Sequence, residues 1–306
     1  MTSAPLAPFL TFIRLGRPHF LVGGFLLHGL GVAMALYEGA QLKLPALLWG
    51  QVAITAIQWM TQYSNEYFDL AVDRANRTPT RWSGGSRVLA EGLLPPVVAL
   101  VTATILAAVA LTAALVLALV LKSGGLALPL LVLALLLAWG YSAPPLRLHS
   151  RGLGELTTAV LVTGMTPLVG YYLQANRLAL LPFLAVLPLC CLQFAMLLMI
   201  EFPDAAGDAA GGKRTLVVRM GGARAASLYL AALLAAYGSL PLLVALGLPL
   251  PAAIAIGLGA PVAMWQGRRM LRQAWTDPAA WNGLALGSIG LLIGTIALEL
   301  LAFLWR

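Results

Sequence analysis

The sequence is poor in charged residues. Only 10% of its 306 residues are Asp, Glu, Lys or Arg, whereas 60% are hydrophobic, and the mean hydropathy is +0.89. This balance excludes an ordinary soluble globular protein, in which about a quarter of the residues are charged. Uncharged stretches of about 20 residues, the length that a helix needs to cross a bilayer, recur from end to end. The sequence therefore predicts an integral membrane protein.

Cysteine and histidine are also scarce. The two cysteines, Cys190 and Cys191, are neighbours inside an apolar run, where we expect two buried thiols and neither a disulfide nor a metal site. The three histidines, His19, His28 and His149, have no metal-ligand spacing, so we expect them at packing or membrane-interface positions. The alternating pattern of a membrane barrel strand is missing, which favours helices and an all-α fold.

Breaks at charged residues, Gly and Pro divide the chain into nine predicted membrane spans. They cover residues 18–37, 45–68, 95–121, 125–143, 153–174, 178–202, 224–247, 249–267 and 282–304. The longest polar stretches between them, 69–93 and 204–222, have the size of loops. We therefore expect a single transmembrane domain over residues 1–306.

The basic residues are divided unequally between the two sides of the predicted bundle. Fifteen of the 19 Lys and Arg residues fall in one set of alternate loops and four in the other. Since cytoplasmic loops carry the excess of positive charge, we expect the N-terminus in the cytoplasm and the C-terminus outside the cell (inner) membrane. The formal charge of +8 would suggest a nucleic acid partner for a soluble protein. Here it indicates orientation against the lipid bilayer and no nucleic acid.

Two acidic clusters lie at the ends of predicted spans, both on the cytoplasmic side. Asn65, Asp69 and Asp73 are spaced i, i+4, i+8, so one face of a continued helix carries all three. Asp204 and Asp208 repeat the four-residue spacing, and the proline before them is well placed to begin a short helix. Two such clusters make an oxygen-rich site of the kind that suits Mg²⁺.

Basic residues accompany both acidic clusters. They are Arg74, Arg77, Arg81 and Arg87 after the first cluster, and Lys213 and Arg214 after the second. A simple metal buffer does not require them. A diphosphate bridged by Mg²⁺ does, because Arg and Lys bind phosphate oxygens while metal ions neutralise a departing diphosphate.

These residues resemble the UbiA superfamily of intramembrane prenyltransferases. Its first motif, NDxxDxxxD, is similar to NEYFDLAVD at 65–73, and its second, DxxxD, to DAAGD at 204–208. GGKRTLVVRMG at 211–221 resembles the segment that follows the second motif in the 1,4-dihydroxy-2-naphthoate branch, and YSAPPLRLHSRGLGE at 141–155 resembles the loop after the fourth helix. The chain departs from the pattern twice: Glu66 replaces the usual Asp, and Glu201 stands where the branch has an Asn-Asn-x-Arg-Asp pattern.

The resemblance implies an enzyme with about nine transmembrane helices around a central cavity open to the cytoplasmic side. It implies Mg²⁺-dependent transfer of a polyprenyl group from a polyprenyl diphosphate to an aromatic acceptor, through an allylic carbocation. The acceptor it favours is 1,4-dihydroxy-2-naphthoate or a similar quinone precursor, as in menaquinone biosynthesis. It assigns metal binding to Asn65, Asp69, Asp73, Asp204 and Asp208, catalysis to these residues and Tyr141, and diphosphate contacts to Arg77, Arg81, Arg147 and Lys213.

Two finer roles follow from position along the chain. We expect Tyr63, Tyr67, Phe68 and Tyr141 to shield the carbocation, and Glu66 or Glu201 to take the ring proton. Other acceptors remain open, namely 4-hydroxybenzoate, a chlorophyll-type alcohol ester or a glycerol lipid. From a different class, a cation-coupled secondary transporter also remains open, because acids in membrane proteins mark ion paths too.

Overall fold

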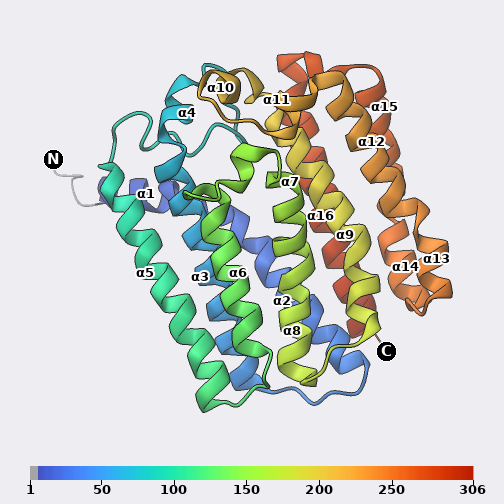
Figure 1. Ribbon diagram of the computed structural model, residues 1–306. Coiled ribbons are helices and arrows are strands. Elements are labelled where there is room, and N and C mark those ends of the chain that lie inside the picture. Colours follow the sequence, from blue (N-terminus) through green and yellow to red (C-terminus); the bar gives the residue numbers. More distant parts are fainter. Residues whose placement is uncertain (1–5, 306) are drawn as a thin grey trace.

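The computed structural model describes residues 6–305, and every regular element within them is a helix (Figure 1). Nine helical rods lie side by side in this part of the chain. The first five are η1 (Pro18–Phe20) with α2 (Leu21–Tyr37), α3 (Leu44–Phe68), α5 (Pro96–Leu115) with η2 (Val116–Val120), α6 (Ala127–Ser142), and α7 (Gly154–Thr158) with η4 (Ala159–Met165) and α8 (Thr166–Ala175). The other four are α9 (Leu180–Glu201), α12 (Gly222–Gly238) with α13 (Leu240–Ala245), α14 (Leu250–Gly257) with α15 (Ala260–Leu271), and α16 (Pro278–Leu304). Each of the nine predicted spans corresponds to a helical rod, with ends moved by a few residues.

Seven of the rods are long and apolar enough to cross a membrane, judged by length and composition within the described residues. The two remaining rods are α6, which has 16 residues, and α3, which carries the amides Gln51, Gln58 and Gln62. Because α3 packs against α2, α5, α6 and α8, protein covers much of its surface. A polar helix is tolerated in the membrane region when neighbouring helices shield it in this way.

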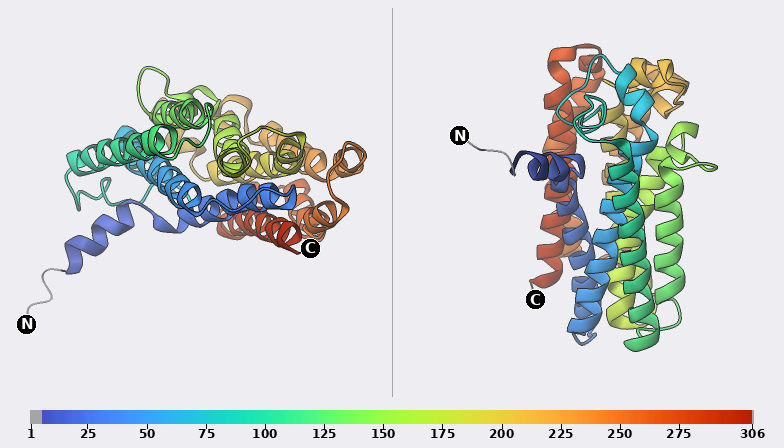
Figure 2. Two further views of the ribbon diagram at one scale, coloured as in Figure 1. Left: turned by 90° about the horizontal axis from the view of Figure 1, so that it is seen from below. Right: turned by 90° about the vertical axis from the view of Figure 1, so that its left-hand side faces the viewer.

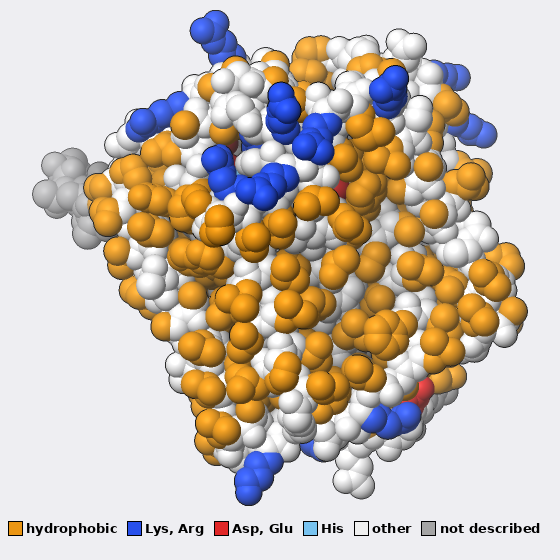
Figure 3. All heavy atoms as spheres, viewed as in Figure 1, with side chains coloured by type: hydrophobic (Ala, Val, Ile, Leu, Met, Phe, Trp, Pro, Cys, Tyr) orange, Lys and Arg blue, Asp and Glu red, His pale blue; other side chains and the backbone are white. Residues whose placement is uncertain are grey.

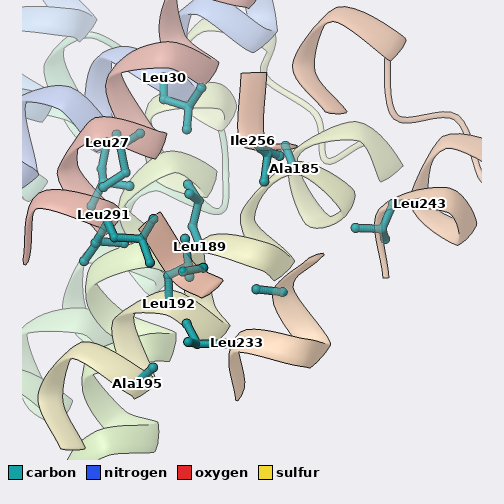
Figure 4. Packing of buried hydrophobic residues seen from close by; sticks show 14 of the residues in the cluster. Leu27, Leu30, Ala185, Leu189, Leu192, Ala195, Leu233, Leu243, Ile256 and Leu291 are labelled. Atoms are coloured by element: carbon teal, nitrogen blue, oxygen red, sulfur yellow. The ribbon is translucent and has the colours of Figure 1, made fainter. Parts of the chain in front are cut away.

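Close packing of small residues holds the rods together, since lipid tails are as apolar as the side chains and give helices little hydrophobic drive to associate. A Cβ atom on Gly31 of α2 would lie 2.0 Å from the Pro167 carbonyl oxygen, and one on Gly170 of α8 would lie 2.5 Å from that of His28. The two helices therefore approach at backbone distance. Larger side chains fill the spaces elsewhere, as around Leu189 in Figure 4.

Short helices cover one end of the bundle. They are α4 (Leu70–Ala75), η3 (Leu148–Arg151), α10 (Ala205–Ala210) and α11 (Leu216–Met220). We call this the acidic end, because both acidic clusters lie there, and the C-terminal end of α16 lies at the opposite end (Figure 1). The predicted short helix after Pro203 is confirmed as α10.

Two further short helices lie off the rods. The helix α1 (Leu6–Leu15) runs across the direction of the rods (Figure 2), and η5 (Ala274–Thr276) joins α15 to α16. Leu15 of α1 is fully buried in the cluster that surrounds α3. The C-terminus is predicted to lie on the outer side of the membrane, but its last residue, Arg306, is not among the described residues.

The surface has the character of a membrane protein. In Figure 3 hydrophobic side chains cover the middle of the molecule, and Lys and Arg side chains gather toward the acidic end. Many large apolar residues are exposed along the rods, among them Leu119, Leu234 and Leu136. An exposed apolar belt of this extent is stable only when lipid covers it.

Candidate active site

A cavity of about 670 Å³ opens at the acidic end and continues between the rods. Its deeper wall is mainly apolar, with Leu27 and Ile54 on the N-terminal helices and Leu292 and Ile296 on α16. Its wall at the acidic end is polar. Among the predicted site residues, those lining it are Asn65, Asp69, Asp73, Arg81, Tyr141, Asp204, Asp208 and Lys213. Two clusters more than 130 residues apart in sequence therefore meet in one cavity.

The first cluster keeps its helical spacing although the helix changes name within it. α3 ends at Phe68 and α4 begins at Leu70. The Asp69 amide donates to the Asn65 carbonyl at 2.8 Å, and the Asp73 amide to the Asp69 carbonyl at 2.9 Å. Hydrogen bonds of the i to i−4 kind thus continue through the junction, which keeps the three side chains on one face.

Asp69 is the most heavily contacted carboxylate in the cavity. His149 Nε2 lies 2.6 Å from its Oδ1, while Lys213 Nζ and Asn65 Nδ2 donate to its Oδ2 at 3.1 Å and 2.9 Å. Burial alone would raise the pKa of Asp69, but the charge of Lys213 and the contact with His149 outweigh burial and hold that pKa below its usual value. Asp69 is therefore ionised at any working pH. The prediction that His149 is only a packing residue is wrong.

Lys213 connects the two acidic clusters. Besides donating to Asp69, its ammonium lies 3.8 Å from Asp208 Oδ1. Burial alone would lower the pKa of Lys213, but the two aspartates outweigh burial and raise it. The Lys213 amide also donates to the Asp208 carbonyl at 2.8 Å, which fixes the backbone next to the second cluster. Lys213 is accordingly a permanent cation at the centre of the site.

The second cluster is held by donors from the first half of the chain. Asp204 stands before the first residue of α10, and its two oxygens accept from Asn76 Nδ2 at 2.7 Å and from the Gly84 amide at 2.9 Å. Asp208 is less satisfied, because its Oδ2 is buried and has no hydrogen-bond partner. Burial raises the pKa of both carboxyls, that of Asp208 to about 7.

Glycines allow the two clusters to approach. Gly207 of α10 and Gly211, the residue after α10, lie four residues apart. A Cβ atom on Gly207 would lie 2.9 Å from Asn76, the residue after α4, and one on Gly211 would lie 2.7 Å from Val72 of α4. Added Cβ atoms at such distances require a shift of the chain. The DAAGDAAGG segment therefore supplies both the acids of the second cluster and the glycine face that seats them against the first.

The UbiA prenyltransferase family matches residues 26–289, which is most of the chain. This chain belongs to the UbiA prenyltransferase family. It is accordingly an enzyme of the prenyltransferase class, and its apolar rods agree with a multi-pass membrane protein.

Known proteins of this family resemble the chain in sequence and in fold. The 1,4-dihydroxy-2-naphthoate octaprenyltransferase of Bacillus subtilis (strain 168) is 26% identical over 227 residues, covering 73% of this chain and 70% of that relative. The apo structure of a UbiA homolog from Aeropyrum pernix K1 matches with a TM-score of 0.67 at 19% identity, over 92% of this chain and 96% of that one. A UbiA homolog from Archaeoglobus fulgidus, bound to GPP and Mg²⁺, matches with a TM-score of 0.63 at 14% identity, over 94% and 99%. These structural likenesses show the fold.

The carboxylate and amide oxygens of this cavity are the ligand type that a hard divalent cation prefers. Their present arrangement does not form a ligand cluster. Among the described residues, no three of the His, Cys, Asp and Glu side chains gather closely enough to hold a metal ion. Protein donors occupy Asp69 and Asp204 instead, whereas Asp208 Oδ2 is buried and unpaired. Burial, followed by the charges of Glu66 and Asp69, raises the pKa of Asp73 to about 7. A cation in the cavity would relieve both Asp73 and Asp208.

Two basic residues predicted to contact diphosphate lie elsewhere. Arg77 and Arg147 are exposed and do not line the cavity. Arg17, one of the fifteen basic residues in the loops predicted to be cytoplasmic, does line it. Its Nη2 donates to Asn65 Oδ1 at 3.3 Å and its Nε lies 3.4 Å from Glu66 Oε1. Closeness in sequence to an acidic motif therefore does not determine which basic residues line the cavity. The fold brings Arg17 to the first acidic cluster from a distant part of the chain.

Glu66 and three of the four predicted aromatic residues do not line the cavity. The Glu66 carboxylate is buried and accepts from the Ser86 amide at 2.6 Å and the Ser86 hydroxyl at 2.7 Å, so Glu66 is a structural group, and of the two expected proton acceptors Glu201 is the one that lines the cavity. Tyr63, Tyr67 and Phe68 do not line the cavity; Tyr63 instead donates to the Phe12 carbonyl at 3.2 Å. Tyr141 does line it, and so does Glu201.

Asn76 is a site residue that the sequence did not reveal. It ends α4, is buried, donates to Asp204 and accepts from the Thr78 amide at 2.9 Å. It therefore bridges the two acidic clusters. The signal that could have found it is its place three residues after Asp73, one helical turn farther along the same face.

We expect Asn76→Ala to lower prenyl transfer by about tenfold and to destabilise the fold by about 1–3 kcal/mol, because Asp204 loses a buried donor. Asn76→Asp should lower the transfer rate and the stability further, since it places a second negative charge next to Asp204. Initial rates and thermal unfolding in detergent check both. Asn282→Ala is the matched control, because Asn282 is an amide at the same end whose Oδ1 accepts only from the exposed Arg81 amide at 3.2 Å. Equal losses in Asn76→Ala and the control would contradict the bridging role.

Proposed function

We propose that this prenyltransferase transfers a polyprenyl group from a polyprenyl diphosphate to an aromatic acceptor in a Mg²⁺-dependent reaction. The acceptor is 1,4-dihydroxy-2-naphthoate or a similar quinone precursor, and the whole chain serves as one catalytic domain. The observation that supports this best is one cavity with four aspartates, Glu201 and Lys213 toward its acidic end and an apolar wall behind them. The name of the Bacillus subtilis relative supports the naphthoate, and the GPP and Mg²⁺ in the Archaeoglobus fulgidus structure support the donor and the metal.

Two kinds of side chain in the polar wall bind the diphosphate of the donor. Asn65, Asp69, Asp73, Asp204 and Asp208 provide the oxygen ligands for Mg²⁺, which when bound supplies positive charge against the diphosphate oxygens. Lys213 and the two cavity-lining arginines, Arg17 and Arg81, contribute fixed positive charge to the same oxygens. A positive wall of this kind stabilises the charge that develops on the leaving diphosphate.

The reaction then follows from charge separation. The bond between the allylic carbon and the diphosphate oxygen breaks, and its electron pair leaves with the diphosphate. An electron-rich carbon of the acceptor ring donates a pair to the allylic cation and forms the new carbon–carbon bond. The ring then loses its proton to Glu201, the expected proton acceptor that lines the cavity. Tyr141, whose ring lies 5.1 Å from that of His149, is an aromatic residue of the cavity wall that can stabilise the cation. The apolar wall keeps water away from that cation.

The membrane both supplies the donor and sets the orientation of the enzyme. The apolar tail of a polyprenyl diphosphate lies among the rods or in lipid while its charged head reaches the acidic end. We place this end at the cytoplasmic face of the cell membrane, with the N-terminus inside and the C-terminus outside. The concentration of basic side chains toward the acidic end supports that placement.

Transfer by the purified protein tests the proposal. The protein in detergent or vesicles, given Mg²⁺, a labelled polyprenyl diphosphate and a set of acceptors, should release diphosphate and form a prenylated ring with dihydroxynaphthoate. Chelation of Mg²⁺ should stop both. Product with 4-hydroxybenzoate, a chlorophyll-type alcohol ester or a glycerol lipid, and none with the naphthoate, would overturn the acceptor assignment.

Metal affinity should rise steeply with pH below about 7. The pKa values of Asp73 and Asp208 are raised to about 7, first of all by burial, so both carboxyls are mostly protonated at pH 6. A bound proton competes with the metal; raising the pH through 7 removes the proton and strengthens Mg²⁺ binding, by up to about tenfold per carboxyl per pH unit. Asp69, whose pKa is lowered, adds no slope in this range. Mg²⁺ titration calorimetry from pH 5.5 to 8.5 measures the slope, and Asp208→Asn should reduce it. A pH-independent affinity would contradict the prediction.

A further inference from the structure

A stripe of polar side chains runs along one face of α3 into the cavity. Its members are Gln51, Thr55, Gln58, Gln62 and Asn65, spaced alternately by four and three residues. The two ends of the stripe have partners. Gln51 Oε1 lies 3.0 Å from His28 Nδ1 and its Nε2 donates to Thr55 at 2.9 Å, while Asn65 donates to Asp69. The two members between them, Gln58 and Gln62, line the cavity.

Gln58 has an unmet hydrogen-bonding group. Its side-chain Oε1 is buried and has no hydrogen-bond partner. Gly24 of α2 makes room for it, because a Cβ atom there would lie 2.0 Å from that oxygen. The neighbouring wall is apolar, with Ile54 and Ile57 on the same helix. A buried polar atom without a partner is unfavourable, so a ligand that meets it gains affinity.

A second amide lines the cavity from α9 at a similar depth in the bundle. Gln193 is 6% exposed and lines the cavity. Gln58 precedes Asp69 by eleven residues, and Gln193 precedes Asp204 by eleven. At about 1.5 Å of helical rise per residue, both amides lie two to three turns deeper in the bundle than the acids. They are polar groups in the part of the cavity that is otherwise lined mainly by hydrocarbon.

The prenyl donor cannot satisfy these amides. Its charged end belongs with the carboxylates and Lys213, and its tail has no hydrogen-bonding atom. The partner must therefore come from the acceptor, a step that rests on the proposed function. We propose that Gln58, together with Gln193, binds a ring hydroxyl of the acceptor and so selects hydroxyl-bearing aromatic rings. A hydroxyl both donates and accepts, so it pairs with either end of an amide. A ring held there presents its other edge toward the acidic end, where the allylic carbon forms.

The first test pairs a substitution with a change in the acceptor. The probes are 1,4-dihydroxy-2-naphthoate and its two mono-O-methyl ethers. Gln58→Leu should raise KM for the naphthoate by about tenfold and leave KM for the polyprenyl diphosphate unchanged. Methylation of the bound hydroxyl should raise the acceptor KM of the unmodified protein by about the same factor. The acceptor KM of Gln58→Leu should change little on methylation, because the hydrogen bond is already lost. The subsite would be overturned if the effects of methylation and of Gln58→Leu on the acceptor KM were additive, or if Gln58→Leu changed the donor KM.

Controls separate this subsite from folding and from the proposed function. Gln51→Leu is the matched control, because Gln51 belongs to the same stripe but already has partners and does not line the cavity; it should change thermal stability and not the acceptor KM. Gly24→Ala displaces the Gln58 amide without removing it and should reproduce the loss of acceptor affinity if Gln58→Leu fails to fold. Equilibrium binding of the naphthoate, measured without donor, tests the subsite apart from turnover. Binding that is weakened by Gln58→Leu in a protein that transfers nothing would uphold the subsite and overturn the proposed function.

Discussion

Asp69→Asn is expected to lower prenyl transfer by about a thousandfold, the largest effect of any single substitution in the cavity. Asp69 combines a lowered pKa with contacts to His149, Lys213 and Asn65. It is therefore the carboxylate that stays charged when Asp73 and Asp208 are partly protonated. An amide keeps the size of the side chain but loses the charge that the metal requires. The initial rate at saturating donor and Mg²⁺ measures the loss.

A second substitution separates lost chemistry from lost stability. Asp69→Asn leaves the Lys213 ammonium with the Asp208 carboxylate, 3.8 Å away, as its remaining ion-pair partner, so the loss of stability should be a part of the about 3–5 kcal/mol that a fully uncompensated buried charge costs. Combining it with Lys213→Met removes both partners, so thermal stability should recover while activity stays low. Thermal unfolding in detergent and the transfer assay together decide the matter. Activity above about a tenth of the unmodified enzyme in Asp69→Asn would contradict the assigned role.

Local spacing predicted the shape of each acidic cluster but misjudged its electrostatics. From the i, i+4 spacing alone, Asp69 and Asp73 repel each other. In the fold Asp69 is neutralised by a lysine 144 residues away and contacted by a histidine 80 residues away. Neither partner is visible to a rule about neighbouring positions on one helix, which is why His149 was expected to be a packing residue.

The spans were predictable because hydropathy is a property of each segment by itself. All nine appear as helical rods in the described residues, and α3 was found even though its amides lower its hydropathy. The residues that line the cavity were harder to predict. Which of the basic residues reach it depends on how the loops fold back, so Arg17 and Arg81 line it while Arg77 and Arg147 remain in solvent.

Gly207→Val is expected to lower transfer by about a hundredfold without unfolding the bundle. A Cβ atom at this position would lie 2.9 Å from the Asn76 Cα atom, and backbone cannot give way as a flexible side chain can. The substitution must move α10 away from α4, and with it Asp204 and Asp208 away from the first cluster. Displacement of a catalytic group by about 1 Å costs about a hundredfold in rate.

Ala209→Val on the same short helix is the matched control, because Ala209 is exposed and an added side chain there meets solvent. It should leave the rate and the thermal stability almost unchanged. Gly207→Val should also weaken Mg²⁺ binding measured without substrate, since the two clusters no longer share one site. If Gly207→Val bound Mg²⁺ and transferred prenyl groups as well as the control does, the acids would not need to meet across the α4–α10 contact, and catalysis would have to rest on one cluster alone.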